Sequence, residues 1–438
     1  MDGAFRCESC VVEGSRWQPA FLDRAKARLI KRMCLNLAPV GRSRILAAAL
    51  TVVVAVFAHA VRTCAGSGSV DAKLTEVLIP GAPDRGIFDP SITTDGSGRL
   101  FMSVSGIGST AEGSSIGANA VRTYLAVSDD QGSSWRLAGL LNPEIEVRLD
   151  TAAAPRRGRW QSEVSALVHD AEAPRAARWK LFWHQYLNVN GDRKFQHGWI
   201  AYKEAETAEG LAAATPIKLI TALGYDPVND QAAGWTHASI SGPAVVRVQD
   251  LAPDLAHCAA VSEPGVLDKP DGLYLSLVCY RGSLFGLFGV STRVILLRCA
   301  RPCTPTRPGA WSYAGTVLTE DDAKGAGMNK FSASDLFSES SRDFVAVSPV
   351  GTVPGKGAYK GCIVYRLADL SKAKIARESD ARPHAEAKIG LDRDSFNGAC
   401  TFLPTGAKKG LLIGRVDFAK RQNVVEPTFR VFMTGVVP

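Results

Sequence analysis

Short runs of apolar, β-branched and aromatic residues recur along the chain from about residue 72 to its end, separated by turns rich in Gly, Asp and Pro. Within these runs apolar residues alternate with polar ones or stand side by side, and the spacing of an amphipathic helix is scarce. Strand-length runs with this pattern, bounded by turn residues, predict β-strands. We therefore expect an all-β domain over residues 72–438.

The runs repeat as five copies of one pattern, in which an inner segment with a polar or acidic residue precedes a second and a third strand. We expect the inner segments at residues 88–92, 162–166, 262–266, 333–337 and 396–400. The expected second strands are 99–105, 179–186, 272–278, 343–347 and 410–416, and the third strands are 123–127, 198–202, 294–297, 361–365 and 428–432. Radial repetition of small sheets leaves only short, protected edges, so the pattern predicts a five-bladed β-propeller. Segment 73–80 is expected to add the outermost strand of the last blade and so close the ring.

Net charge excludes one class of function. The chain carries a formal net charge of +8, but residues 1–44 hold nine Lys/Arg and four Asp/Glu and so account for most of it. Because the basic excess lies outside the β-domain, we expect no nucleic-acid partner.

The basic segment 1–44 leads into an uncharged apolar segment at 45–61 and a linker at 62–71. A positive stretch, an apolar core and the small-residue pattern of Ala58, His59 and Ala60 are typical of a signal peptide. The alternative is an uncleaved transmembrane anchor, because the apolar stretch lies at the lower edge of the length that spans a bilayer. Both interpretations predict an exported domain, whether periplasmic, cell-surface or secreted. We expect this domain to be monomeric and to contact the membrane only through the N-terminal segment.

Cysteine usage agrees with export. Six of the ten cysteines lie in the β-domain, namely Cys258, Cys279, Cys299, Cys303, Cys362 and Cys400, and an even number in an oxidising compartment indicates disulfides. Six cysteines allow about fifteen pairings, so only the small loop between Cys299 and Cys303 is singled out. No zinc-type spacing is present in the domain, and no cofactor is expected. A structural or axial Ca²⁺ stays open, because carboxylates on inner strands suit a hard cation.

Each inner segment carries one polar residue that we expect at the same position of its blade. These residues are Asp89, Glu163, Glu263, Asp335 and Asn397. Inner strands of a propeller line the central axis, so these side chains are predicted to converge on one pocket. Carboxyl groups that share a partly dry pocket push their pKa values apart, which yields the acid and base that glycoside hydrolysis requires.

A further motif lies at residues 128–135, where Ser128, Asp130, Gly132, Ser134 and Trp135 fit a Ser-x-Asp-x-Gly-x-Ser-Trp pattern. It resembles the Asp box, the hairpin repeat of sialidases and related propellers. We expect Asp130 to bind turn N–H groups, Gly132 to adopt a positive φ and Trp135 to pack between strands. The motif keeps a six-bladed sialidase-type propeller open as an alternative fold.

The five repeats, the start at residues 88–92 and the segment 262–265 resemble the five-bladed glycoside hydrolases that include arabinanases, β-xylosidases and invertases. The resemblance implies that Asp89 is the general base or nucleophile, that Glu263 is the general acid and that Glu163 modulates the acid. The middle carboxylate of that group is usually Asp, so Glu163 departs from its pattern. We expect Asp335 and Asn397 to be pocket walls.

Two other functions stay open, and both share a carbohydrate partner. An exo-sialidase needs arginines that grip a carboxylate and an activated tyrosine, for which Arg85, Arg281, Arg366 and Tyr365 are candidates. The missing Arg-Ile-Pro start and the five repeats count against it. A non-catalytic glycan-binding propeller would instead stack aromatic residues such as Trp160 on sugar faces.

Overall fold

The computed structural model describes residues 74–109, 119–150, 155–189, 192–222, 239–240, 242–281, 291–353, 356–390, 396–421 and 424–438. The chain divides into two units, Met1–Gly68 and Ser69–Pro438. The segments 1–44 and 45–61 and the linker at 62–71 lie outside the described residues, so the signal peptide and the anchor stay predictions. In the part of the chain that is described, no helix has the length and apolar character needed to cross a membrane.

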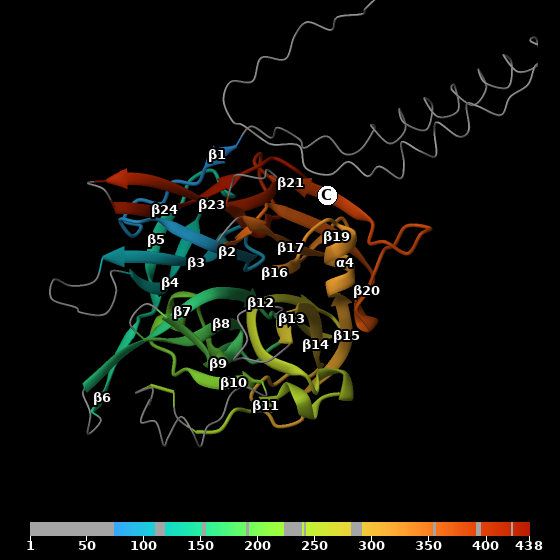
Figure 1. Cartoon of the computed structure of the whole chain (residues 1–438), viewed down its shortest axis with the longest axis horizontal. Coiled ribbons are helices and arrows are strands. Elements are labelled where there is room, and N and C mark those ends of the chain that lie inside the picture. The colour runs from blue at the N-terminus through green and yellow to red at the C-terminus, as the bar shows by residue number, and fades with distance from the viewer. Residues whose placement is uncertain are drawn as a thin grey trace, which may run out of the picture. The chain divides into compact units, whose positions relative to one another are not determined.

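Five sheets, antiparallel except where β11 pairs with β10, succeed one another along the second unit, one for each predicted repeat (Figure 1). Blade 1 consists of β2 (Ile87–Thr94), β3 (Leu100–Ser109), β4 (Asn119–Ser128) and β5 (Arg136–Asn142). Blade 2 consists of β6 (Ile145–Asp150), β7 (Pro155–His169), β8 (Trp179–Val189), β9 (Asp192–Ala205), β10 (Ile217–Thr221) and β11 (Val246–Arg247). Blade 3 consists of β12 (Cys258–Lys269), β13 (Gly272–Arg281), β14 (Ser291–Ala300) and β15 (Trp311–Leu318).

Blade 4 consists of β16 (Lys330–Glu339), β17 (Arg342–Val353), β18 (Lys356–Tyr359), β19 (Cys362–Asp369), β20 (Lys374–Ile375) and β21 (Ala385–Ile389). Blade 5 consists of β22 (Phe396–Leu403), β23 (Gly410–Arg421) and β24 (Val424–Met433), and β1 (Thr75–Glu76) pairs with β24 as its outermost strand. The first and last strands of the domain thus share one sheet, as expected for segment 73–80. The five-bladed prediction is confirmed, and the six-bladed alternative is wrong.

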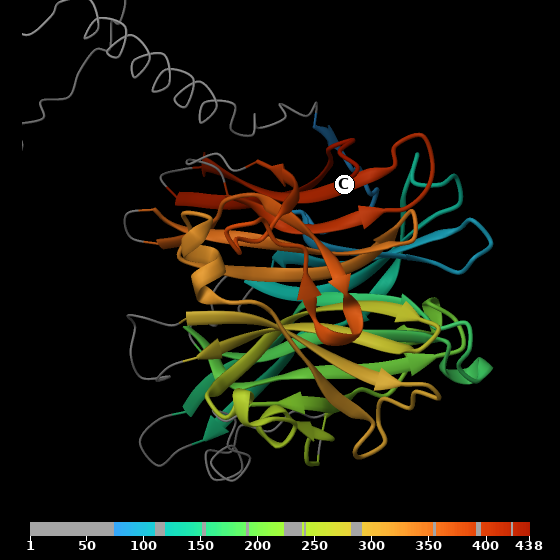
Figure 2. The same ribbon diagram turned by 90° about the vertical axis from the view of Figure 1, so that its right-hand side faces the viewer.

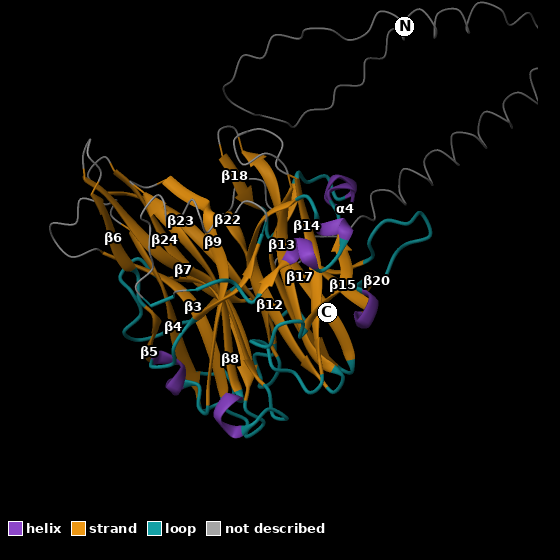
Figure 3. Ribbon diagram, turned by 90° about the horizontal axis from the view of Figure 1, so that it is seen from below, coloured by secondary structure: helices purple, strands orange, loops and turns teal. Residues whose placement is uncertain are grey.

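Helices are short in the described residues. The longest is α4 (Glu320–Gly325), which begins at a capping box in which Thr319 and Asp322 each satisfy a backbone N–H of the other. Strands make up nearly all of the regular structure (Figure 3), and the sheets are seen edge-on in Figure 2.

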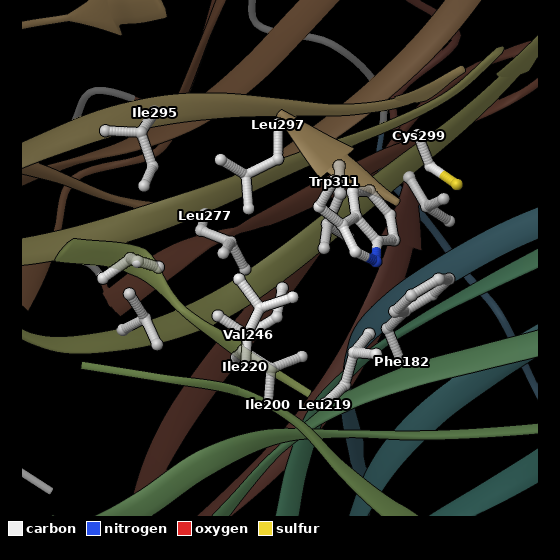
Figure 4. Packing of buried hydrophobic residues seen from close by; sticks show 14 of the residues in the cluster. Phe182, Ile200, Leu219, Ile220, Val246, Leu277, Ile295, Leu297, Cys299 and Trp311 are labelled. Atoms are coloured by element: carbon white, nitrogen blue, oxygen red, sulfur yellow. The ribbon is translucent and has the colours of Figure 1, made fainter. Parts of the chain in front are cut away.

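Packing between blades explains why the strands read as nearly continuous apolar runs. Side chains from blades 2 and 3 interdigitate in one cluster that includes Phe182, Ile200, Leu277, Leu297 and Trp311 (Figure 4). Burial of each such side chain contributes about 1.5–3 kcal/mol relative to exposure. Because a blade is covered on both faces by its neighbours, its strands need apolar residues on both faces.

Three disulfides occur, Cys258–Cys279, Cys299–Cys303 and Cys362–Cys400. The small loop expected between Cys299 and Cys303 is confirmed. The third bond joins β19 of blade 4 to the inner strand β22 of blade 5, beside the central axis. The four N-terminal cysteines lie outside the described residues.

A buried ion-pair network joins blades 2 and 3. Asp170 follows β7 and is fully buried, and both of its carboxylate oxygens accept 2.8 Å hydrogen bonds from the Arg301 guanidinium, which follows β14. The Lys180 ammonium lies 3.2 Å from the same carboxylate, and Arg301 also binds Asp268. Burial opposes ionisation of Asp170, but the hydrogen bond of Arg301 and the charge of Lys180 outweigh it and hold its pKa below the ordinary value.

The turn at residues 128–135 has the local contacts expected of it. The Asp130 carboxylate accepts hydrogen bonds from Ser128 Oγ at 2.8 Å and from the backbone N–H and hydroxyl of Ser134 at 2.8 and 2.6 Å. Gly132 has a φ of +87°, and Trp135 is buried. All these contacts are local, so they organise a turn and carry no link to sialidase chemistry.

Candidate active site

All five inner strands contain a β-bulge at which one residue has a positive φ. These residues are Asp89 (49°), Val164 (49°), Glu263 (56°), Ala333 (46°) and Ala399 (53°). The strand register shifts at each of these points. A positive φ is costly for residues with a Cβ, and bulges re-aim side chains next to functional sites. Five equivalent bulges around one axis therefore define the candidate site.

The bulges correct the expected alignment of the repeats. Asp89 and Glu263 occupy the bulge position of blades 1 and 3, as expected. Glu163 precedes the bulge of blade 2 by one residue, Asp335 follows that of blade 4 by two, and Asn397 precedes that of blade 5 by two. The expectation of one shared position is wrong for these three, because alanine or valine occupies the bulge in their blades.

Glu263 lies in the first half of β12, and its carboxyl group contacts blade 4. Oε2 accepts hydrogen bonds from Ser332 Oγ at 2.5 Å and from the Ala333 N–H at 2.6 Å, and Oε1 accepts one from the Tyr359 hydroxyl at 2.9 Å. The side chain is almost fully buried. Three neutral donors thus fix the position of this carboxyl group.

Tyr359 is a site residue that the sequence analysis missed. It ends the short strand β18, and its ring packs on Gly398, where an added Cβ would lie 2.6 Å from a ring carbon. Burial, and then the charges of Glu263 and Asp89, raise the pKa of Tyr359 well above its ordinary value. The charges of Asp89 and Glu263, 174 positions apart in sequence, thus both raise the pKa of the same hydroxyl. The only sequence signal was an aromatic residue just before the third strand of the fourth repeat.

The bulge N–H groups bind the preceding blade. The Val164 N–H donates to Ser105 Oγ at 2.9 Å, and the Ala399 N–H donates to Ser348 Oγ at 2.7 Å. In blade 3 the equivalent second-strand residue is Val278, which offers no side-chain oxygen. The Glu263 carboxylate takes that place and accepts from Ala333.

Glu163 occupies the same position in blade 2 that Ser332 occupies in blade 4, one residue before the bulge. Ser332 reaches the carboxyl group at the bulge of the blade before it. The blade before that of Glu163 carries Asp89 at its bulge. Glu163 is buried and pairs across the strands with His184, which is also buried.

A narrow cavity of about 20 Å³ lies between the five inner strands, lined by residues that include Asp89, Ser91, Ser165 and Asp335. It has room for about one water molecule. Burial raises the pKa of Asp335 to about 7, although the Thr401 hydroxyl and the Leu336 N–H hydrogen-bond its carboxyl group. Asp335 thus lines this cavity between the inner strands.

Polar side chains also lie near the start of β12 and the end of β13. The Ser262 hydroxyl donates to the Tyr280 hydroxyl at 3.2 Å, and the Lys330 ammonium lies 5.6 Å from the Tyr280 ring centroid. Arg281 ends β13 beside Cys258, and its buried Nε has no hydrogen-bond partner in the described chain. Arg85 precedes β2, where its backbone is held by Ile107 and Phe429.

Two groups of expected residues do not join the site. Trp160 is fully buried and packs on Trp199 at 4.7 Å between ring centroids, so the expectation that it stacks on a sugar is wrong. Tyr365 is buried in the core of blades 3 and 4, and Arg366 pairs with Glu386 at 3.1 Å. The structure therefore does not assemble the sialidase set of arginines and tyrosine from these residues.

In the described ranges no three His, Cys, Asp or Glu residues gather closely enough to hold a metal ion. A structural or axial Ca²⁺ stays a prediction, and Asp89 and Asp335 both line the narrow cavity.

No protein-family model and no curated protein matches the chain. It is similar to solved structures, among them a thermostable family-43 glycoside hydrolase, with 11% identity over 82% of this chain and 91% of that one and a TM-score of 0.42. The catalytic domain of the Coprinopsis cinerea GH62 α-L-arabinofuranosidase has 11% identity, coverage of 83% and 96%, and a TM-score of 0.44. A family 117 glycoside hydrolase from Zobellia galactanivorans has 10% identity, coverage of 82% and 89%, and a TM-score of 0.45. With identities this low and TM-scores below 0.5, function has to be argued from the chain's own residues.

Proposed function

We propose that the protein is an exported glycoside hydrolase that cleaves glycosidic bonds with carboxyl groups at the axial bulges. The observation that carries the proposal is the setting of Glu263. Its carboxyl group is buried and held by two hydroxyls and one N–H, and its charge and that of Asp89 both raise the pKa of Tyr359. Glycoside hydrolysis needs two carboxyl groups, one to protonate the leaving oxygen and one to act as base or nucleophile.

Glu263 is suited to the role of general acid because of the chemistry of its partners. Ser332 and Tyr359 present hydroxyls, which can donate to a carboxylate or accept from a carboxylic acid. A proton on Oε1 can point to the Tyr359 oxygen in the resting enzyme and to the glycosidic oxygen once substrate binds. The carboxyl group therefore gains and loses a proton without losing its position.

Asp89 is assigned the role of base or nucleophile. It has the bulge position of blade 1 and a strained positive φ, which supports a fixed, functional side-chain direction. The equivalence of Glu163 with Ser332 supports a position for Glu163 beside Asp89, from which its charge would tune the pair. Asp335 and Asn397 are the proposed walls of the substrate pocket, and Arg85 and Arg281 are proposed contacts at its mouth.

Export of the domain is supported by the three disulfides, which form in oxidising compartments, and by the signal-like segment at 45–61. The proposed substrate is therefore an extracellular or cell-envelope carbohydrate. The proposed monomer contacts the membrane only through its N-terminal segment.

The proposal is tested by incubating the purified protein with aryl arabinofuranoside, xyloside, fructofuranoside and sialoside. We expect hydrolysis of one of the first three. On unactivated phenyl glycosides, Asp89→Asn and Glu263→Gln should each lower kcat/KM by about 10²–10⁴-fold, whereas Asp130→Asn, in the exposed turn, should match the wild type. Absence of all hydrolysis, together with glycan binding that survives both active-site substitutions, would contradict catalysis and favour a non-catalytic glycan-binding propeller.

A further inference from the structure

A second and larger cavity lies between blades 1 and 2, apart from the axial site. Its volume is about 390 Å³, within the range of small-molecule pockets. Its described walls come from β5, β6, β7, β8, β9 and residues 212–216 and 239–240. The lining is mostly apolar and includes Leu141, Ile145, Trp183, Pro216 and Ile240.

Lys203, on β9, brings the positive charge of its ammonium group to this cavity. Its side chain is 3% exposed, and its ammonium donates a 2.7 Å hydrogen bond to the Leu141 carbonyl and lies 5.5 Å from the Trp183 ring centroid. Among the described residues that line the cavity, none is acidic. Lys203 forms no ion pair with any residue in the described part of the chain.

The acidic groups nearest in sequence are already engaged elsewhere. Glu204 binds the Tyr202 hydroxyl, Glu206 pairs with Arg175 at 2.7 Å, and Glu209 lies 3.8 Å from Arg99. Lys203 alternates with Tyr202 and Glu204 along β9, so these two side chains leave the opposite face of the strand.

The polar side chains of the lining are also engaged with the protein. Asn142 Nδ2 donates to Thr123 Oγ1 at 2.6 Å. Gln185 Oε1 accepts hydrogen bonds from Trp183 Nε1 and Ser162 Oγ, while its Nε2 donates to the Gln161 carbonyl. The described part of the lining thus offers the Lys203 ammonium and apolar surface, while the amide groups of Asn142 and Gln185 are already engaged.

Burial of an ammonium is costly unless a counter-charge lies beside it, and none is present among the described residues. Burial lowers the pKa of Lys203 to about 7. An anion in the cavity would supply the missing charge. The apolar walls would accommodate the rest of the molecule, as in pockets where a few polar groups orient an apolar ligand.

We propose that this cavity binds a small carboxylate with an apolar body, whose carboxylate pairs with the Lys203 ammonium. Benzoate has the required charge and shape, and benzyl alcohol has the same ring without the charge. The site is separate from the axial carboxyl groups, and it requires no glycosidase activity.

The test is calorimetric titration of the full-length protein with benzoate, butyrate and benzyl alcohol at pH 6.5 and pH 8. Binding of a carboxylate is expected at pH 6.5 and should weaken nearly tenfold at pH 8, because the amine must then take up a proton. That proton uptake appears as a difference in apparent enthalpy between two buffers of unlike ionisation enthalpy. Benzyl alcohol should bind at least tenfold more weakly at pH 6.5 and show no pH dependence.

Lys203→Met is the diagnostic variant, because methionine keeps the apolar stem and removes the charge. It should abolish carboxylate binding and leave any weak binding of benzyl alcohol. Lys218→Met is the matched control. Lys218 lies on β10, is buried, and has its ammonium 4.5 Å from the Trp199 ring centroid, but it does not line the cavity. The proposal is overturned if neither carboxylate binds the wild type, if benzyl alcohol binds as tightly as benzoate, or if Lys203→Met binds benzoate like the control.

Discussion

Two buried carboxyl groups each join neighbouring blades, but with opposite kinds of partner. Asp170 follows the end of β7 and is bound by the Arg301 guanidinium and the Lys180 ammonium. Glu263 lies near the start of β12 and is bound by Ser332, Tyr359 and a backbone N–H. Both positions are almost completely buried.

The two kinds of partner differ in whether they allow the carboxyl group to be protonated. Guanidinium and ammonium groups only donate hydrogen bonds, so protonation of Asp170 would leave buried cations unpaired. Hydroxyls donate or accept, so Glu263 can change its protonation state and keep its contacts. The carboxyl group that must hold the fold is thus paired with cations, and the one that would carry a proton is held by neutral groups.

The largest effect on stability is expected for Asp170→Asn. Loss of this charge leaves the Lys180 ammonium, which is 1% exposed, without its carboxylate, and should cost about 3–5 kcal/mol in the free energy of unfolding. Urea unfolding at pH 7 measures it. Because the pKa of Asp170 is lowered in the folded state, its contribution is present above the ordinary pKa and is lost in acid, so the difference should shrink as pH falls. A loss below about 1 kcal/mol at pH 7 would contradict the claim that Asp170 stabilises the fold through its ion pairs.

The second-largest effect is expected in the pH dependence of folding stability that Asp335 causes. Its folded-state pKa is raised to about 7, so the folded protein keeps a proton that the unfolded chain has already released. Wild-type stability should therefore fall as pH rises from about 4 to about 7. The free energy of unfolding of Asp335→Asn, compared with that of the wild type, should therefore increase by about 2–3 kcal/mol between pH 5 and pH 8. A difference between the two proteins that does not change with pH would show that Asp335 is ionised in the folded state.

Tyr359→Phe tests whether the Tyr359 hydroxyl contributes to catalysis through its hydrogen bond to Glu263. The ring keeps its contact with Gly398, but Oε1 loses its hydroxyl partner. A hydrogen bond to a charged group is worth about 1.5–3 kcal/mol, so kcat should fall about 10- to 100-fold with a smaller change in KM. Steady-state kinetics on the aryl glycoside measures both. Unchanged kcat would remove Tyr359 from the site.

The smallest effect is expected from a matched pair of serines. Ser348→Ala and Ser332→Ala each remove a hydroxyl beside an axial bulge, and each should cost about 1 kcal/mol in unfolding free energy. Only Ser332→Ala should slow hydrolysis, because only Ser332 contacts Glu263. Equal activity of both variants would contradict the assigned roles.

The strands could be predicted from the sequence because their apolar patterns are local. Every predicted inner, second and third strand overlaps an observed one, and the closing strand at segment 73–80 is present. The fourth strands were not singled out, because their mixed composition resembles that of the connecting loops.

The site was predicted only in part, because the bulges have no local signature. A positive φ usually indicates glycine, yet Asp89, Val164, Glu263, Ala333 and Ala399 adopt it under the constraint of packing around the axis. The position of each bulge is defined only by the pairing of the inner strand with its neighbour in the folded domain. Trp160 was predicted to stack on a sugar but lies in the core. An aromatic residue on a strand gives the same sequence pattern in a core as in a pocket.

The most direct test of the central claim compares Glu263→Gln with the wild type on aryl glycosides whose leaving groups differ in acidity. A residue that protonates the leaving oxygen matters most when the leaving group is a poor one. Glu263→Gln should therefore lose about 10³-fold in kcat/KM on an unactivated phenyl glycoside and less than about tenfold on the 2,4-dinitrophenyl glycoside. Equal losses on both substrates would show that Glu263 holds the site together without donating a proton, and would contradict the account.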